Sequence, residues 1–65
     1  MKIILNGDAA EVSGATLQAV LDECGFADAR VATAVNGEFV AKTARADCAL
    51  SDGDRLEVLA PMQGG

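Results

Sequence analysis

Few groups in this 65-residue chain are able to take part in covalent chemistry. The thiols are Cys24 and Cys48, and the chain has no histidine to act as a base for either. Cys24 falls on the apolar face of a predicted helix, where we expect a buried, unreactive thiol. Cys48 lies in a predicted loop and is more accessible, but it has neither a base nor a resolving cysteine, so redox or sulfur chemistry there is the weaker interpretation.

The sequence does not indicate a metal or nucleotide site. Asp52 and Asp54 flank Gly53 as at the start of a calcium loop, but the later oxygen ligands are missing, so a tight turn is the better interpretation. Two cysteines without histidine do not make a four-ligand zinc site. No glycine-rich nucleotide motif is present either. We therefore expect this chain to bind no cofactor, and any ATP used with it to be bound by another protein.

The remaining reactive group is the α-carboxylate of Gly65, at the end of the segment PMQGG. Pro61 favours extended backbone around it, so we expect residues 61–65 to project from the last strand, with a reach of about 16–18 Å. Gly64 and Gly65 lack a Cβ and are able to pass a narrow constriction in a partner's active site. There the carboxylate can be activated as an acyl-adenylate and attacked by sulfur or nitrogen. On the tail alone, an inert flexible end is the simpler alternative.

Hydrophobic periodicity predicts the elements that must carry this tail. Residues 1–5 alternate as in a half-buried strand, and Asn6-Gly7 predicts a tight hairpin turn into a second strand that ends near Val12. The segment TLQAVLDECG has apolar residues at i, i+3, i+4 and i+7, with Thr16 as N-cap and Gly25 as the residue that ends the helix. The first half of the chain therefore predicts two strands and one amphipathic helix.

The second half predicts another hairpin, which turns at Asn36-Gly37, and then a looser segment from which Leu50 fills the core. A last strand follows, with Leu56, Val58 and Ala60 facing inward. One helix covers only one face of a mixed sheet. We therefore expect an α+β fold of the β-grasp type, with a mixed sheet of four to five strands, the first and last strands adjacent at its centre, and one main helix on one face. Residues 1–60 are the expected domain, and residues 61–65 its flexible C-terminal tail.

Composition and charge argue against several classes of function. A core this small leaves no room for a deep catalytic cavity, so we do not expect an enzyme. The net charge of −5 repels nucleic-acid backbones, and no apolar stretch approaches the roughly 18 residues of a membrane span. Neither nucleic acid nor a membrane is an expected partner. The first residues do not have the pattern of a signal peptide, and we expect a cytoplasmic monomer.

Four segments occur in a characteristic order over essentially the whole chain: IILNGDAAEV, TLQAVLDECG, VATAVNGEFV and LSDGDRLEVLAPMQGG. In these segments the chain resembles the small sulfur carriers of thiamine biosynthesis, which are ubiquitin-like β-grasp proteins. The resemblance implies that an E1-like adenylyltransferase uses ATP to adenylate the Gly65 carboxylate. It implies next that a sulfur donor such as a cysteine desulfurase provides the sulfur of a C-terminal thiocarboxylate, which donates it to thiazole synthase.

The same resemblance implies roles for residues near the end of the chain. The residues expected to thread the partner's active site are Gly64, Gln63 and Met62, and the expected docking surface includes Leu59 and Ile4. Three alternatives stay open: the small subunit of molybdopterin synthase, a carrier that supplies another sulfur pathway, and a non-catalytic ubiquitin-like interaction module. The compact length and the segment AVNGEFV favour the thiamine carrier.

Overall fold

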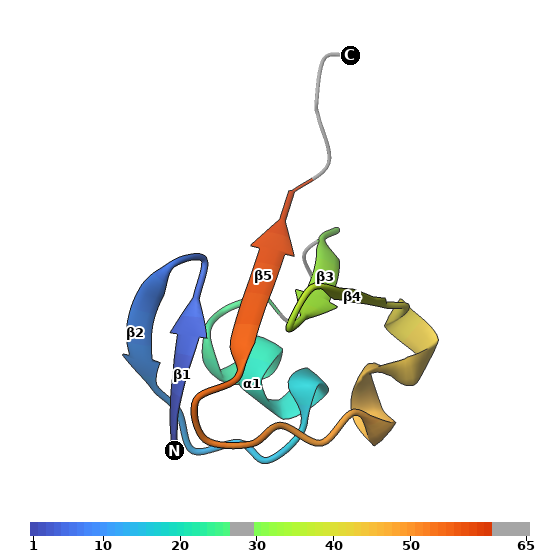
Figure 1. The fold of residues 1–65 in the computed structure, drawn as a ribbon. Coiled ribbons are helices and arrows are strands. Elements are labelled where there is room, and N and C mark those ends of the chain that lie inside the picture. The colour runs from blue at the N-terminus through green and yellow to red at the C-terminus, as the bar shows by residue number, and fades with distance from the viewer. Residues whose placement is uncertain (27–29, 61–65) are drawn as a thin grey trace.

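The computed structural model describes residues 1–26 and 30–60 (Figure 1). In chain order the elements are β1 (Lys2–Leu5), β2 (Asp8–Glu11), α1 (Leu17–Glu23), β3 (Ala32–Val35), β4 (Glu38–Val40), the 3-10 helix η1 (Lys42–Asp47) and β5 (Arg55–Leu59). The five strands form one mixed sheet in the order β2-β1-β5-β3-β4. Strands β1 and β5 are parallel, and every other neighbouring pair is antiparallel. The predicted β-grasp arrangement, with the first and last strands adjacent at the centre, is confirmed.

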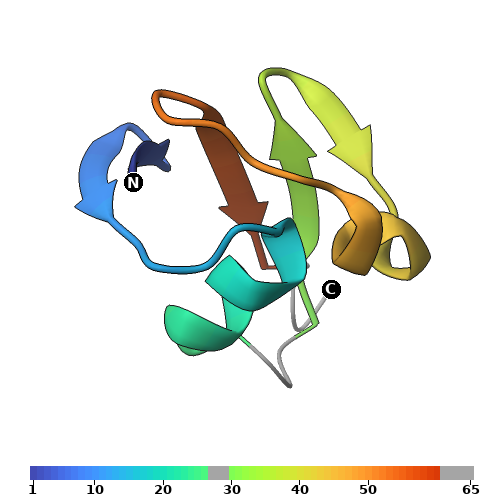
Figure 2. The same cartoon turned by 90° about the horizontal axis from the view of Figure 1, so that it is seen from below.

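Helix α1 packs on one face of this sheet, as Figure 2 shows, and its apolar face supplies much of the core. The buried apolar residues are Ile3, Val12, Leu17, Val20, Leu21, Leu50, Leu56 and Val58. Full burial of a side chain of this size contributes about 1.5–3 kcal/mol before the loss of conformational entropy. Leu50 fills the core from the segment before β5, as predicted. The core thus holds β5 against the helix.

Both ends of α1 have the caps that the sequence predicts. The Thr16 hydroxyl accepts a hydrogen bond from the Ala19 N–H at 3.2 Å, which satisfies one of the free N–H groups of the first turn. At the other end Gly25 has a φ of +91°, and the Phe26 N–H donates to the Leu21 carbonyl at 2.8 Å. This is the bond that closes a Schellman motif.

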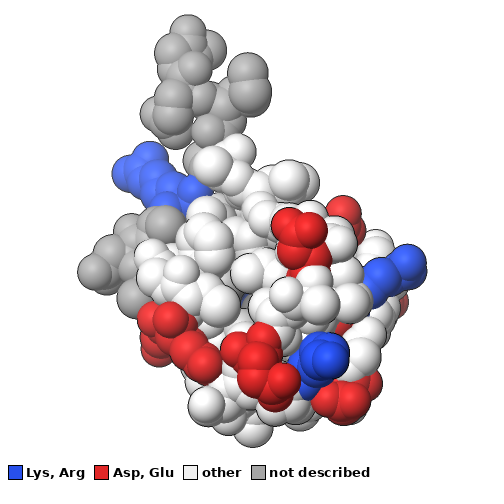
Figure 3. Space-filling view, turned by 90° about the vertical axis from the view of Figure 1, so that its left-hand side faces the viewer, with Lys and Arg blue, Asp and Glu red and all other residues white. Residues whose placement is uncertain are grey.

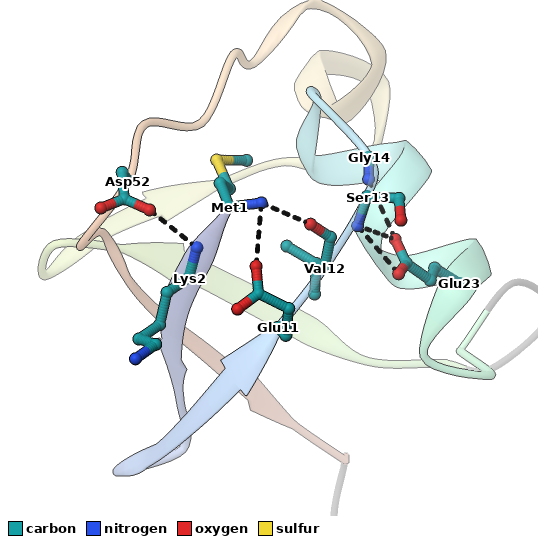
Figure 4. A network of polar contacts seen from close by, with 8 residues as sticks. All are labelled: Met1, Lys2, Glu11, Val12, Ser13, Gly14, Glu23 and Asp52. Atoms are coloured by element: carbon teal, nitrogen blue, oxygen red, sulfur yellow. Dashed lines mark hydrogen bonds and ion pairs between the residues drawn. The ribbon is translucent and has the colours of Figure 1, made fainter.

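A carboxylate on α1 also fixes the loop that enters the helix. Glu23 accepts hydrogen bonds from the backbone N–H groups of Ser13, at 2.9 Å, and Gly14, at 3.0 Å (Figure 4). Gly14 lies so close to the helix that an added Cβ would stand 2.8 Å from the Ala19 Cβ and 3.0 Å from the Val20 nitrogen. Only glycine allows this approach, so the loop and the helix are matched in shape as well as in hydrogen bonding.

The start of β1 is tied to segments far along the chain. The Met1 ammonium donates to the Val12 carbonyl at 2.7 Å and lies 3.2 Å from the Glu11 carboxylate (Figure 4). The Lys2 N–H donates to the Asp52 carboxylate at 2.8 Å. These contacts position β1 beside its two neighbours, β2 and β5.

The segment after β4 differs from the loose connection that we predicted, because residues 42–47 form the 3-10 helix η1. Arg45 on this helix is buried: its Nε donates to the Thr33 hydroxyl at 3.1 Å, and its Nη2 donates to the Val31 carbonyl at 2.6 Å. The Thr33 hydroxyl in turn donates to the Val40 carbonyl at 2.8 Å. Because these partners lie on the β3–β4 hairpin, the arginine joins η1 to the hairpin, a contact that hydrophobic periodicity does not reveal.

Two sequence predictions about residues at the ends of elements are wrong. Cys24 is exposed, because α1 ends at Glu23 and Cys24 is the C-cap, one residue beyond the last helical position. Ala60 is exposed as well, because β5 ends at Leu59 and its inward alternation stops at Val58. In both cases the periodic pattern was extended past the end of its element.

Candidate functional site

The structure describes the chain only up to the point where the predicted reactive tail begins. Met62, Gln63, Gly64 and Gly65 lie outside the described residues, and the described chain ends at Ala60, directly after β5. The geometry of the site is therefore the geometry of β5 and of the surface around its last residues.

Strand β5 is fixed on both sides. It pairs with β1 on one side, and on the other its last residue, Leu59, lies opposite Ala32 of β3. Beyond the end of β1 the Asn6 side chain takes over the pairing: its Oδ1 accepts from the Val58 N–H at 2.8 Å, and its Nδ2 donates to the Val58 carbonyl at 3.2 Å. The strand that leads to the tail is thus secured within one residue of its end.

The second Asn-Gly turn secures the other end of the same strand. Asn36 Oδ1 accepts from the Arg55 N–H at 3.0 Å, and the Asn36 N–H donates to the Arg55 carbonyl at 2.8 Å. Both asparagines have positive φ, +48° at Asn6 and +51° at Asn36, and each is followed by a glycine with positive φ. This is the backbone of the predicted type I′ hairpin turns. The sequence indicated the turns but not the side-chain bonds to β5.

The sheet face opposite α1 exposes large apolar side chains. Phe39 on β4 is 72% exposed and Leu59 on β5 is 64% exposed. Across the sheet, Phe39 lies opposite Ala34 of β3, and Ala34 lies opposite Glu57 of β5. Along β5, the exposed residues Glu57 and Leu59 alternate with the buried Leu56 and Val58, so Leu59 is on the same face as Glu57. Phe39 and Leu59 therefore share one face.

The two residues expected on a docking surface lie apart along this face. Ile4 is half-buried and lies opposite Arg55, whereas Leu59 is four residues further along β5, a separation of roughly 13 Å at strand geometry. Each borders its own hollow. One, of ≈ 280 Å³, is lined by Ile4, Gly7, Gly37, Arg55, Leu56 and Glu57, and the other, of ≈ 320 Å³, is lined by Arg30, Val31, Ala32, Leu59 and Ala60. Sequence reasoning did not single out Arg30 or Phe39.

The cysteines show no arrangement for nucleophilic catalysis. Partial burial and the neighbouring Glu23 carboxylate raise the pKa of the Cys24 thiol, which keeps it protonated at neutral pH. Cys48 is half-buried at the C-cap of η1, so it is less accessible than Cys24 and the predicted order of accessibility is wrong. Within residues 1–26 and 30–60, no group of three or more His, Cys, Asp or Glu side chains is placed to hold a metal ion. No helix in the same ranges is long and apolar enough to span a bilayer.

The two aspartates around Gly53 act in the turn before β5. Asp52 accepts from the Lys2 N–H. Asp54 accepts from the Ser51 N–H at 2.8 Å and from Asn36 Nδ2 at 3.1 Å, and these hydrogen bonds, the first above all, lower the pKa of its carboxyl. Gly53 has a φ of +89°. This supports the interpretation of the segment as a tight turn.

Comparison with known proteins gives a consistent result. Residues 3–65 match the ThiS family. The chain is 43% identical over 61 residues to the sulfur carrier protein ThiS of Thermus thermophilus, covering 94% of this chain and 95% of that protein. It is 39% identical over 66 residues to a protein of Paramagnetospirillum magneticum named thiazole synthase, of which it spans only 20% of the length.

Solved structures agree in fold. The crystal structure of the thiamine biosynthesis protein ThiS from Geobacter metallireducens superimposes with a TM-score of 0.84 at 32% identity, over 100% of both chains. A solution structure of a thiamine biosynthesis protein from the same organism gives a TM-score of 0.78 at 30% identity, over 100% of this chain and 88% of that one. Since the family match takes in residues 3–65 and the carrier relative is matched almost end to end, the chain belongs to the ThiS family of small sulfur carrier proteins, which have the β-grasp fold.

Proposed function

We propose that this protein carries sulfur as a thiocarboxylate on the carbonyl carbon of Gly65 and donates it to thiazole synthase in thiamine biosynthesis. The observation that carries the proposal is that the family match extends to residue 65, so that it includes the Gly64-Gly65 pair. The likeness to the Thermus sulfur carrier and to a segment of a thiazole synthase supports the role and the acceptor.

The proposed activation takes place in a partner enzyme. In an E1-like adenylyltransferase, a carboxylate oxygen of Gly65 attacks the α-phosphorus of ATP, which forms an acyl-adenylate and releases pyrophosphate. A persulfide from a donor such as a cysteine desulfurase then displaces AMP and forms an acyl disulfide. A thiol cleaves the sulfur–sulfur bond and leaves the thiocarboxylate. The chain itself binds no cofactor in this scheme, and because the activation consumes ATP we propose a cytoplasmic carrier, monomeric when free.

The role of this chain is to present the reactive carbonyl group to the partner enzymes. A carbonyl carbon on glycine is unhindered, and Gly64 allows the backbone to pass a narrow channel. Met62 and Gln63 would lie within that channel, and the fixed β5 holds the root of the tail while the end reacts. A carrier of this kind needs no base of its own, because the partner supplies the acid–base groups.

Intact-mass spectrometry tests the proposal. After incubation with ATP, the adenylyltransferase, a sulfur donor and a thiol, we expect the wild-type chain to gain the mass difference between sulfur and oxygen. A variant without Gly65 should show no gain, since the reacting carbonyl is then one residue short of its position. If the wild-type protein stays unchanged with partners that convert another member of the family, the carrier function is refuted; a conjugate on lysine would point to a protein modifier instead.

A further inference from the structure

The hollow of ≈ 320 Å³ lies where the described chain ends. Arg30 and Val31 enter it from the segment before β3, and Leu59 and Ala60 enter it from the end of β5. Since Ala32 lies opposite Leu59 in the sheet, the two walls belong to neighbouring strands. Figure 1 shows the start of β3 beside the upper end of β5. We call these five residues, Arg30, Val31, Ala32, Leu59 and Ala60, the root groove.

The root groove is apolar apart from a single cation. Among the described residues that line it, none is acidic, and the exposed Arg30 is the charged one. Among residues 1–26 and 30–60, no ion pair to Arg30 is found. The chain as a whole has ten acidic and five basic residues, so a basic position next to the tail stands out against the general charge.

The charge is also distributed unevenly over the surface. Figure 3 shows one face on which acidic side chains lie mostly over the lower half, with basic groups among them, while another basic group lies apart from them at the upper left. Arginine is enriched at the energetic centres of protein interfaces, where apolar contact excludes water from a charge-assisted hydrogen bond. The exposed Leu59 lines the same groove and supplies apolar surface beside Arg30.

The position of the groove limits what occupies it. Residues 61–65 span at most about 16–18 Å. A protein that takes Gly65 into its active site must therefore lie within that distance of the root groove, which makes the groove one of the nearest surfaces for it to contact. The Paramagnetospirillum relative named thiazole synthase contains, within one longer chain, a segment 39% identical to this protein. Thiazole synthase is therefore the partner that the comparisons favour.

We propose that the root groove is the docking site for thiazole synthase, which inserts an apolar side chain against Leu59 and places a carboxylate on Arg30. The inference rests on the proposed function, because it assumes that the synthase receives the tail. It assigns the recognition of the acceptor to residues outside the Gly-Gly end. It also assigns Leu59, and not Ile4, to the docking site, because Ile4 lines the other hollow.

Binding measurements with matched controls test the proposal. Two variants change the root groove, Arg30→Glu and Leu59→Asp. The control for the charge reversal is Arg55→Glu, at the other end of β5. The control for the loss of an apolar side chain is Phe39→Asp, at an exposed position two strands away on the same sheet face. Titration calorimetry gives the Kd of each full-length variant for purified thiazole synthase, and circular dichroism checks that each is folded. We expect the Kd to rise about tenfold or more for the two groove variants and by less than about twofold for the controls. The wild-type Kd should also rise with salt more steeply than that of Arg30→Ala.

The outcomes separate this inference from the proposed function. If the wild-type chain forms the thiocarboxylate but both groove variants keep a Kd within about twofold of wild type, the docking site is wrong and the carrier function stands. The docking site is equally overturned if the groove variants lose only conversion by the adenylyltransferase, or if the controls weaken binding as much as the groove variants do. If the wild-type chain neither forms the thiocarboxylate nor binds the synthase, the proposed function itself fails.

Discussion

Asn6 and Asn36 each have two structural roles, one in the backbone of a turn and one in side-chain hydrogen bonding. Glycine in the same place would fulfil only the first. Their positive φ angles close the hairpin turns, and their side chains form hydrogen bonds to the two ends of β5. Asparagine tolerates the left-handed region better than other non-glycine residues. At the residue scale, the two turns therefore also position the strand that leads to the tail.

We predict that Asn6→Gly destabilises the fold by about 1–2 kcal/mol, although glycine adopts the required backbone readily. The variant loses both bonds to Val58 and leaves that part-buried N–H and carbonyl to water. Unfolding in urea, monitored by circular dichroism, measures the change. Asn36→Gly is the control: its side-chain bonds lie at exposed positions, so its loss should be smaller. Equal stability of Asn6→Gly and wild type would show that the side-chain pairing contributes nothing.

At the scale of elements, α1 and the loop before it form one unit. The loop approaches the helix closely at Gly14, and Glu23 near the end of the helix accepts two N–H groups of the loop. The N-cap at Thr16 lies between these contacts. The conformation of the loop and the start of the helix therefore depend on each other.

We predict that Gly14→Ala destabilises the protein by about 1–3 kcal/mol. The added Cβ would meet the Ala19 Cβ at 2.8 Å and backbone atoms of residues 19 and 20 at 3.0 Å, and helix backbone does not move aside as a flexible side chain would. Thermal unfolding measures the effect, with Ala15→Ser as a control at the exposed neighbouring position. A Gly14→Ala variant as stable as wild type would mean that the loop shifts freely.

The elements were predictable where a local pattern determines them. Asn-Gly pairs favour type I′ turns, and the spacing of Leu17, Val20 and Leu21 is typical of a helix with one buried face, so the order and type of these elements followed from the sequence. Helix η1 was missed, because its anchor is the buried Arg45, and the partners of Arg45 lie on a hairpin that only the folded chain brings near.

The surroundings of the tail were predictable only in part. Leu59 was expected at the surface near the tail and is 64% exposed there. Arg30 carried no signal, since it becomes notable only when the register of β3 against β5 places it in the groove with Leu59. The exposure of Cys24 depended on a helix end, and an error of one residue reversed the prediction.

At the scale of the whole molecule, the core and the tail use separate parts of the chain. Every buried apolar residue identified in the described chain lies between Ile3 and Val58. The sheet, α1 and the turn contacts of β5 all lie within residues 2–59. Stability and reactivity are thus assigned to different segments, and a change in one segment is expected to leave the other intact.

We predict that one extra residue after Gly65 abolishes thiocarboxylate formation and leaves the melting temperature within about 2 °C of wild type, since no core contact changes. Calorimetry measures the melting temperature, and intact-mass spectrometry measures conversion. Deletion of residues 61–65 is the matched control and should give the same pair of results. A large drop in melting temperature in either variant would show that the domain extends beyond residue 60.

The parallel pairing of β1 and β5 at the centre of the sheet also has a mechanical consequence. The two strands run in the same direction, with the N-terminus at the lower end of β1 and the end of β5 at the top (Figure 1). Tension on the tail therefore loads the bonds from Ile4 to Asp54, from Asn6 to Leu56 and from Val58 to the Asn6 side chain together, in shear, instead of one after another. An enzyme can pull the tail taut into its active site while the sheet resists extraction.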